Sequence, residues 1–320
     1  MKRIALLILP LLFASWLNGT DKNLNCFTIL AGKDATADGS VLLAHNEDDH
    51  GRLLVNINKV PAREPRRGEV FTLKSGAVLA QTGRSHGLLW LDIPESDFAD
   101  AYVNEYGVAV TSNSCPSRED KPELTAGGIG FSLRRLVAER AQTARDGVRI
   151  AGELISQYGY SGSGRTYAIA DAREGWLLHA VNGKHWLARR VPDNHVAVIA
   201  NRYTIGRVDL GDRGNFQGSP DIIAYAVRRG WHVPEKDGEF NFARAYSAAE
   251  DFADMRSILR QWRGADLLAA KPPKLDGPQP FSFKPDRDLR LNDLFRVLRD
   301  HYEGTKHDAS DHYKSGSPNS

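Results

Sequence analysis

Two different spacings of hydrophobic residues divide the chain. From residue 26 to about residue 110, short apolar, β-prone runs alternate with turn residues, and Asp38-Gly39 marks the turn between the first two runs. Between residues 129 and 158 the apolar positions follow helical spacing, and Asp146-Gly147 separates two predicted helices. The strand pattern then returns until residue 200. Strands, then helices, then strands again favour a layered α+β domain over a doubly wound sheet.

The individual elements follow from these runs. Strands are predicted at 26–31, 40–44, 53–60, 70–73, 101–103, 108–110, 167–170, 176–180, 186–190 and 196–200. Later helices are predicted at 222–227, 251–262 and 291–301. The segment 305–320 is polar and has no apolar period, so we predict a flexible tail or a truncated edge there.

The chain opens on a basic start and a short apolar run. Met1-Lys2-Arg3 precede the apolar stretch 4–17, whose ~14 residues are too few to span ~30 Å of hydrocarbon as a helix. This order is typical of a secretory signal peptide, which we assign to residues 1–19, although Leu17-Asn18-Gly19 is a poor cleavage motif. No later run is long and apolar enough to cross a membrane. We therefore expect a secreted or periplasmic protein without membrane contact once the signal is removed.

Composition excludes several classes of function. The 42 Lys and Arg residues nearly balance 40 Asp and Glu residues, so nothing favours a nucleic-acid partner, which needs a basic excess. Hydrophobic residues make up 41% of the chain, which argues against wholesale disorder, collagen-like repeats and coiled coil. Two cysteines are too few for a disulfide scaffold or a Cys-rich zinc site. With no zinc pattern and no phosphate-cradling loop, we expect neither a metal nor a cofactor.

Cys26 is the most informative residue of the sequence. It follows the signal peptide by a few polar residues and begins the first predicted strand. A cysteine at a mature N-terminus carries its own base, because its free α-amine has a pKa near ~8. The alternative in an exported chain is a disulfide between Cys26 and Cys115. Cysteine counting alone leaves both open.

The sequence around Cys26 resembles a known family. The run from Cys26 through Gly32-Lys33, Asp38-Gly39-Ser40 and His45-Asn46-Glu47-Asp48 is similar to the start of the cysteine dipeptidases of the N-terminal-nucleophile hydrolase superfamily, the dipeptidase A and secernin group. The resemblance continues at 104–109, 164–176, 185–193, 198–206, 237–242 and 261–264.

This resemblance implies a four-layer αββα sandwich with the nucleophile on a central strand. It implies hydrolysis of dipeptides through a thioester, and removal of everything before Cys26. Residues 20–25 would then be a short propeptide and residues 26–304 the hydrolase domain. Small peptides are the expected partners, and a homo-oligomer is compatible with this assignment. Family chains usually run longer, so the sandwich can be truncated at its C-terminal edge.

The resemblance also carries site residues. Asp48 matches the family aspartate, which would hold and orient the α-amine of Cys26, whereas its neighbours Glu47 and Asp49 are expected to face solvent. Asn201 matches an active-site asparagine of the superfamily and ends a buried-looking strand, where an amide could serve an oxyanion hole. Asn113 matches a position of the related acylases, although a turn asparagine explains it equally well.

Two positions depart from the family pattern. His45 replaces an arginine that the family often has before Asn-Glu-Asp, and a titratable histidine is a weaker partner than arginine. We expect His45 and Asn46 to contact the substrate. His179 stands where relatives often have glutamate, and we expect it to be an ordinary core or surface histidine.

Two other functions remain open. The first is a linear-amide acylase of the penicillin-V or bile-salt hydrolase type, which shares the cysteine, aspartate and asparagine roles. The second is a non-catalytic secreted domain with a Cys26–Cys115 disulfide.

Overall fold

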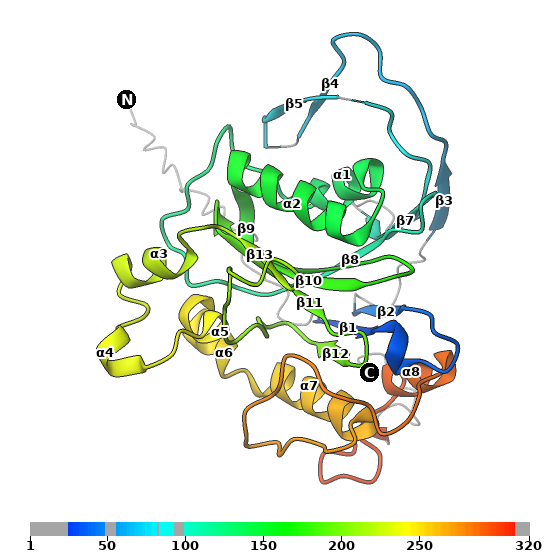
Figure 1. Ribbon diagram of the computed structural model, residues 1–320, viewed down its shortest axis with the longest axis vertical. Helices are drawn as coiled ribbons and strands as arrows, with labels where there is room; N and C mark the ends of the chain where they lie inside the picture. The colour runs from blue at the N-terminus through cyan, green and yellow to red at the C-terminus, as the bar shows by residue number, and fades with distance from the viewer. Residues whose placement is uncertain (1–24, 49–55, 74, 82, 93–98, 311–320) are drawn as a thin grey trace, which may run out of the picture.

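The fold is a sandwich of four layers. The computed structural model describes residues 25–48, 56–73, 75–81, 83–92 and 99–310 (Figure 1). Two antiparallel sheets face each other, and a helical layer covers the outer side of each (Figure 1). This αββα arrangement confirms the predicted fold class. Within the described residues, no helix has the length and apolar character needed to cross a membrane.

The strands form one large and one small sheet. The eight-stranded sheet has the order β13 (Phe216–Gly218), β11 (Trp186–Val191), β10 (Gly175–Gly183), β9 (Tyr160–Ala170), β8 (Ala109–Ser114), β7 (Ala99–Asn104), β6 (Leu88–Asp92) and β3 (Asn56–Val60). The three-stranded sheet has the order β12 (Val196–Ile199), β1 (Asn25–Ala31) and β2 (Leu42–Asp48). A separate hairpin joins β4 (Val70–Thr72) and β5 (Val78–Ala80). Strand β1 lies against β8 of the large sheet, so the chain segment that begins at Cys26 is central.

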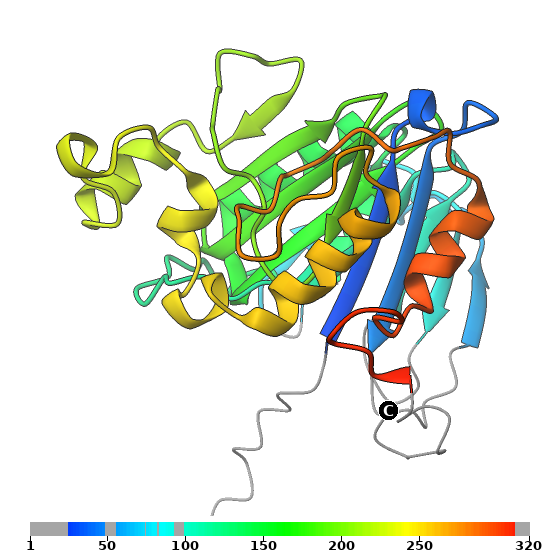
Figure 2. The same ribbon diagram turned by 90° about the horizontal axis from the view of Figure 1, so that it is seen from below.

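The helices fall into three groups. The pair α1 (Ser132–Arg140) and α2 (Ala144–Tyr158) covers the large sheet. Helices α7 (Met255–Leu268) and α8 (Leu291–Leu298) lie across the small sheet, on β12 and β2 (Figure 2). The remaining elements are η1 (Lys33–Ala35), α3 (Ile222–Arg228), α4 (Pro234–Asp237), α5 (Phe242–Tyr246) and α6 (Ala249–Phe252).

Strand β1 is buried on both faces. Phe27 and Ile29 pack toward α7 and α8 with Val198 and Leu268, whereas Leu30 packs between the two sheets. Successive side chains of a strand point to opposite faces, so a strand between a helical layer and a second sheet is apolar throughout. This is why residues 26–31 form one continuous hydrophobic run in the sequence.

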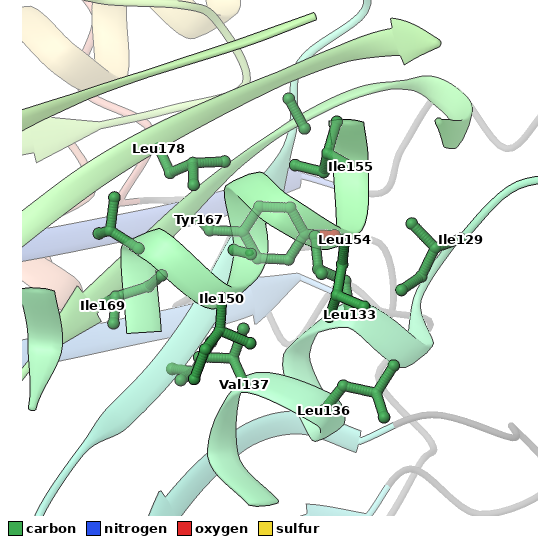
Figure 3. Packing of buried hydrophobic residues seen from close by; sticks show 14 of the residues in the cluster. Ile129, Leu133, Leu136, Val137, Ile150, Leu154, Ile155, Tyr167, Ile169 and Leu178 are labelled. Carbon is green, nitrogen blue, oxygen red and sulfur yellow. The ribbon is translucent and has the colours of Figure 1, made fainter. Parts of the chain in front are cut away.

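The layer of α1 and α2 supplies the largest hydrophobic cluster. Leu133, Leu136 and Val137 of α1, together with Ile155 of α2, are fully buried against Ile169 and its neighbours in the large sheet (Figure 3). Burial of each such side chain contributes ~1.5–3 kcal/mol to stability. The apolar positions that predicted two helices are therefore the positions that hold this layer on the sheet.

The boundary between α1 and α2 lies earlier than predicted. Thr143 caps α2, because its hydroxyl accepts a hydrogen bond from the Asp146 amide at 3.1 Å. Asp146 then lies in the first turn of α2, where a negative charge favours the helix dipole. The pair Asp146-Gly147 therefore belongs to the start of α2 instead of separating two helices.

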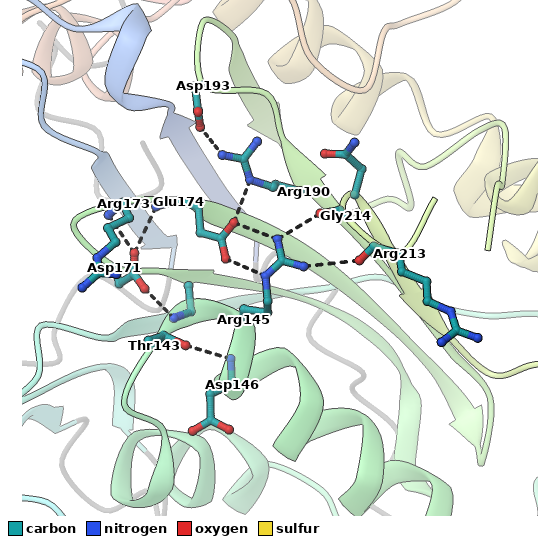
Figure 4. Close-up of polar contacts among 12 residues, drawn as sticks. Thr143, Arg145, Asp146, Asp171, Arg173, Glu174, Arg190, Asp193, Arg213 and Gly214 are labelled. Carbon is teal, nitrogen blue, oxygen red and sulfur yellow. Dashed lines mark hydrogen bonds and ion pairs between the residues drawn. The ribbon is translucent and has the colours of Figure 1, made fainter. Parts of the chain in front are cut away.

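A polar network fixes the N-terminal end of α2 to the β10–β11 hairpin. Glu174 accepts from Arg145 Nη2 at 3.1 Å and from Arg190 Nε at 2.7 Å, and Arg190 also pairs with Asp193 (Figure 4). Asp171 accepts from the Ala144 amide at 2.7 Å, which satisfies another donor of the first helical turn. These bonds position the helical layer over the sheet.

Other predicted boundaries shift as well. The predicted strand 40–44 is β2, which extends to Asp48 and so contains the whole run His45-Asn46-Glu47-Asp48. The predicted helix 251–262 is two helices, α6 and α7. The first ends at Phe252, and Asp254 has an extended backbone conformation and caps the start of α7. The predicted signal peptide 1–19 and residues 20–24 lie outside the described residues. In the predicted tail, residues 305–310 form turns closed by a bond from the Ala309 amide to the His301 carbonyl.

Candidate active site

Cys26 lies near the start of β1, with its side chain directed toward the large sheet. The cysteine is 2% exposed, and its Sγ donates a hydrogen bond to Glu47 Oε1 at 3.2 Å. Burial, and after it the Glu47 carboxylate, raise the pKa of the Cys26 thiol to about 12, while the Ser114 amide and the Arg165 guanidinium act in the opposite direction. In this chain, where Asn25 precedes it, the thiol is therefore protonated at neutral pH.

Glu47 is the partner of this thiol, contrary to the expectation that it faces solvent. Cys26 and Glu47 are opposite each other in the β1–β2 register, and cross-strand partners project to the same face. Asp48 is opposite Asn25 by its backbone position, and its side chain lies outside the described part of the chain. A role of Asp48 in holding the amine remains a prediction.

Asn201 follows β12 and holds the backbone nitrogen of Cys26. Its Oδ1 accepts from the Cys26 N–H at 2.9 Å, and its Nδ2 donates to the Ser114 carbonyl at 3.0 Å. The amide orientation is fixed, because one end faces a donor and the other an acceptor. Asn201 thus lies beside Cys26, while its active-site role stays a prediction. In this geometry it orients the nitrogen of Cys26 and directs a hydrogen to Ser114.

Asn113 of β8 is buried between the two sheets and connects β8 to β1 and to the end of β12. Its Nδ2 donates to the carbonyls of Ile199 and Ala200 at 3.1 and 3.3 Å, and its Oδ1 accepts from the Thr28 hydroxyl at 2.6 Å. Both amide hydrogens are used in these bonds, so in this arrangement Asn113 holds the sheets together and offers no donor to an oxyanion. The residue is buried within β8 and is not a turn asparagine.

His45 lies beside Glu47. Because Thr28 donates to Asn113, the contact of 2.8 Å between Thr28 Oγ1 and His45 Nδ1 requires a hydrogen on Nδ1. His45 Nε2 then lies 3.5 Å from Glu47 Oε2, and the imidazole side chain is only 6% exposed. His45 therefore contacts the carboxylate that accepts from the Cys26 thiol, and a contact of His45 with the substrate stays a prediction.

Asn46 points the other way. Its Nδ2 donates to the Leu298 carbonyl of α8 at 3.0 Å, on the helical side of β2. Adjacent residues of a strand project to opposite faces, so Asn46 is separated from Cys26 by the sheet itself. The side chain thus lies on the opposite face from Cys26, and a contact of Asn46 with the substrate stays a prediction.

Arg260 of α7 is a site residue that sequence reasoning missed. Its Nη1 donates to the Cys26 carbonyl at 2.8 Å, and its Nη2 donates to Asn201 Oδ1 at 2.9 Å and to Asn25 Oδ1 at 3.1 Å. One guanidinium thus contacts both residues of the Asn25–Cys26 peptide bond. The signal in the sequence is only its position immediately before the matched stretch 261–264, and no local pattern marks an arginine on a helix as catalytic.

Comparison with known proteins identifies the family of this chain. The model of "Peptidase family C69" matches residues 25–320. The chain belongs to peptidase family C69.

Several curated relatives of this C69 peptidase are named dipeptidases. A probable dipeptidase of Salmonella dublin is 29% identical over 313 residues, which cover 93% of this chain and 71% of the relative. A dipeptidase of Bifidobacterium longum (strain NCC 2705) is 29% identical over 328 residues, covering 88% of this chain and 60% of the relative. A probable dipeptidase of Latilactobacillus sakei is 26% identical, with 88% and 62% covered. The chain thus spans less than two thirds of the length of the last two.

Solved structures with a distant similarity include an acylase and a hydrolase. Penicillin V acylase from Agrobacterium tumefaciens matches with a TM-score of 0.40 and 13% identity, covering 89% of this chain and 76% of that one. A mutant of conjugated bile acid hydrolase from Clostridium perfringens matches with a TM-score of 0.42 and 12% identity, covering 86% and 78%.

The second cysteine of this C69 peptidase is not bonded to the first. Cys115 is buried, free, and 3.0 Å from Thr166 Oγ1, and Cys26 is likewise a free thiol. The disulfide considered from the sequence is therefore absent between these described residues. Burial raises the pKa of Cys115 to about 12, which makes it an inert core thiol.

His179 is a core histidine, as predicted. It is fully buried, its Nε2 accepts from the amides of Thr204 and Ile205 at 3.0 and 3.1 Å, and its Nδ1 contacts Thr166 Oγ1 at 2.8 Å. Burial lowers the pKa of His179 to about 3, so the ring is neutral. In the described part of the chain, no cluster of three or more His, Cys, Asp and Glu side chains could hold a metal ion.

Proposed function

We propose that this chain is an exported cysteine dipeptidase in which Cys26 is the nucleophile and becomes the N-terminal residue when the preceding segment is removed. The observation that carries the proposal is the set of contacts to Cys26. Its thiol, its nitrogen and its carbonyl each have a dedicated polar partner, respectively Glu47, Asn201 and Arg260. Membership of a peptidase family and the names of the relatives support the choice of dipeptides over acyl amides.

Cleavage of the Asn25–Cys26 bond would activate the thiol. Before cleavage the nitrogen of Cys26 is an amide and cannot accept a proton, and the pKa of the thiol is raised to about 12 by burial and Glu47. After cleavage the same nitrogen is an α-amine with a pKa near ~8. Asn201 Oδ1, which accepts from that nitrogen at 2.9 Å, would hold the amine beside the sulfur.

Self-cleavage would use the same groups. Cys26 Sγ adds to the carbonyl carbon of Asn25, its proton passes to the nitrogen of Cys26, and the C–N bond breaks to leave a thioester. Water then hydrolyses the thioester and releases the segment before Cys26 as a carboxylic acid. Arg260, which contacts the side chain of Asn25 and the carbonyl of Cys26, would keep this bond in place.

The peptidase reaction would repeat these steps on a dipeptide. The α-amine takes the thiol proton, and the thiolate attacks the scissile carbonyl. The amine then returns the proton to the leaving nitrogen, which releases the second amino acid. Water attacks the thioester, releases the first amino acid and restores the thiol. The backbone N–H of Ser114, which already interacts with Sγ, is placed to stabilise the oxyanion.

The test is mass spectrometry of the purified chain together with a dipeptide assay. We expect a mature N-terminus at Cys26 and hydrolysis of dipeptides. Cys26→Ala should be neither processed nor active, and Cys26→Ser should lose nearly all activity, because a hydroxyl has a far higher pKa than a thiol. The matched control is Cys115→Ala, which should be processed and active within a few-fold of the wild type. A fully active chain that keeps residues before Cys26 would refute the mechanism, and preference for acyl amides would favour an acylase.

A further inference from the structure

Arg165 is a buried cation beside the candidate active site. It lies on β9, opposite Ser114 in the β8–β9 register, and is 9% exposed. Its Nε donates to the Tyr160 hydroxyl at 3.2 Å, its Nη1 donates to Ser112 Oγ at 3.1 Å, and its guanidinium lies 4.7 Å from the centre of the Phe131 ring. All of these partners are neutral.

The charge of Arg165 is not balanced by a carboxylate in contact with it. Among the described residues, no ion pair includes this guanidinium. Burying a cation without a counterion costs several kcal/mol, so buried arginines in proteins are normally paired. An unpaired, buried guanidinium at an active site is therefore a site for an anion.

Arg165 is also electrostatically linked to the reacting group. Its positive charge opposes the effects of burial and Glu47 on the pKa of the Cys26 thiol. The other arginine at the site, Arg260, has both Nη atoms engaged by backbone and amide oxygens of Asn25, Cys26 and Asn201. After removal of Asn25, Arg260 would still donate to the Cys26 carbonyl and to Asn201 Oδ1. Arg165, whose described partners are all neutral, is therefore the better candidate of these two arginines for an incoming anion.

A dipeptide brings an anion to this place. Its α-carboxylate is two bonds beyond the scissile nitrogen, so the carboxylate carbon lies ~3–4 Å from the carbon that the thiol attacks. Each further residue would move the carboxylate by another ~3.3–3.6 Å. A guanidinium at Arg165, opposite the Ser114 residue whose amide interacts with the Cys26 thiol, would therefore select peptides by length. The carboxylate also needs a cation here, because the Glu47 carboxylate at the thiol would otherwise repel it.

We propose that Arg165 binds the free α-carboxylate of the substrate and restricts hydrolysis to peptides that end one residue after the scissile bond. The inference rests on the proposed dipeptidase function and names the group that would set its substrate class. Arg165 would be a specificity-determining residue. The planar guanidinium suits this role because it can donate two parallel hydrogen bonds to a carboxylate.

The test compares a dipeptide, alanyl-alanine, with its C-terminal amide. The two substrates differ in one charge, so the ratio of their kcat/KM values measures carboxylate recognition. The wild type should favour the free acid. Arg165→Met should lower kcat/KM for the free acid by about 100-fold more than for the amide, mainly through KM, and the smaller loss on the amide reports the effect of the missing charge on the Cys26 thiol. Arg165→Lys keeps the positive charge but cannot donate two parallel hydrogen bonds to a carboxylate, so its preference for the free acid over the amide should be intermediate.

The matched control is Arg189→Met. Arg189 on β11 is a half-buried arginine whose guanidinium also lies over aromatic rings, 4.4 Å from the centre of the Phe281 ring and 5.3 Å from that of Phe216, and none of its described contacts is with Cys26. Its substitution should leave the ratio unchanged. Retained hydrolysis of the amide by Arg165→Met is the internal evidence that this variant folds.

Two results would overturn the proposal. The first is an equal kcat/KM of the wild type for the free acid and for the amide, a result that can be obtained before any variant is made. The other is an equal loss on both substrates in Arg165→Met with intact folding, since this would mean that Arg165 acts on the thiol alone. Absence of both activities in a wild type with an unprocessed N-terminus is a different result, because it contradicts the proposed function itself.

Discussion

At the scale of single residues, the site shows how one position along a strand changes the chemistry. Glu47 and Asp48 are adjacent acidic residues, and the family pattern favours Asp48. Only the β1–β2 register places Glu47 opposite Cys26, where its carboxylate accepts from the thiol at 3.2 Å. A carboxylate in this position disfavours the thiolate. Glu47 therefore favours the protonated form of the Cys26 thiol.

Replacing Glu47 tests this directly. Glu47→Gln removes the negative charge and should lower the pKa of Cys26 from about 12, because one of the causes that raise it is gone. The measurement is the pH dependence of Cys26 alkylation by iodoacetamide, followed by mass spectrometry in a Cys115→Ala background. The midpoint should move to lower pH. An unchanged midpoint would mean that burial alone sets the pKa.

The matched variant is Asp48→Asn. If Asp48 orients the α-amine of mature Cys26, this change should lower kcat/KM on a dipeptide by on the order of 10²–10⁴, the usual range for a positioned acid–base group. It should leave the alkylation midpoint of the unprocessed chain closer to the wild type than Glu47→Gln does. The two neighbouring residues would then have separable roles.

At the scale of elements, close approach of helices and strands fixes where the site residues sit. Helix α7 brings Arg260 to Cys26 because Gly264, one turn later, lets it lie against β1 and β12. A Cβ at Gly264 would be 3.0 Å from the Phe27 ring and 3.1 Å from a Val198 methyl. On the opposite side, α2 approaches β11 at Gly152, where a Cβ would be 2.0 Å from the Trp186 ring.

Gly152→Ala should therefore destabilise the protein. Alanine favours a helix by ~1 kcal/mol over glycine, but overpacking of a core costs ~1–3 kcal/mol. Trp186 cannot move freely, because its Nε1 donates to Ser156 Oγ at 3.0 Å. We expect a lower midpoint of urea unfolding. Gly147→Ala in the same helix is the control, since its nearest neighbours are methyl groups at 3.0 and 3.1 Å, and it should change stability less. Equal midpoints for both variants would contradict this packing argument.

At the scale of the whole molecule, the site lies where the two sheets meet. Cys26 and Glu47 come from the small sheet, Ser114 and Arg165 from the large sheet, and Arg260 from the outer helical layer. Thr28 and Asn113 join the sheets beneath the nucleophile. Loss of the sandwich would therefore separate the residues of the candidate site, so stability and the proposed activity should be lost together.

Acid should weaken the sandwich through His179. The ring is neutral in the folded protein, with its pKa lowered to about 3 by burial, and has its ordinary value of 6.5 when unfolded. Below pH 6.5 the unfolded chain binds a proton that the folded protein does not, so His179 destabilises the fold by up to ~1.4 kcal/mol per pH unit as the pH falls toward 3.

His179→Gln keeps a donor and an acceptor but does not titrate. Its free energy of unfolding should decline less between pH 6.5 and 4 than that of the wild type, as measured by urea titration at each pH. Parallel pH profiles for wild type and His179→Gln would show that another group causes the acid sensitivity.

The amino-acid sequence by itself determined the elements and the nucleophile candidate. Alternating periods of hydrophobicity reveal strands and helices because the face that each element buries repeats along the chain. Residues 26–31 are apolar throughout because β1 is covered on both sides, and the run of motifs after Cys26 indicated both the family and the αββα layers. His179 could be assigned to the core from the improbability of a lone ligand.

Only the tertiary structure decided which polar groups meet. The strand register places Glu47 against the Cys26 thiol and turns Asn46 toward the helical layer. Contacts between residues far apart in the sequence leave Cys115 as a free thiol and bring Arg260 to Cys26. The unpaired charge of Arg165 is likewise invisible in a one-dimensional pattern. The physical reason is that hydrophobic burial depends on local periodicity, whereas the chemistry of a charged group depends on its distance to other charges and to water, which only packing sets.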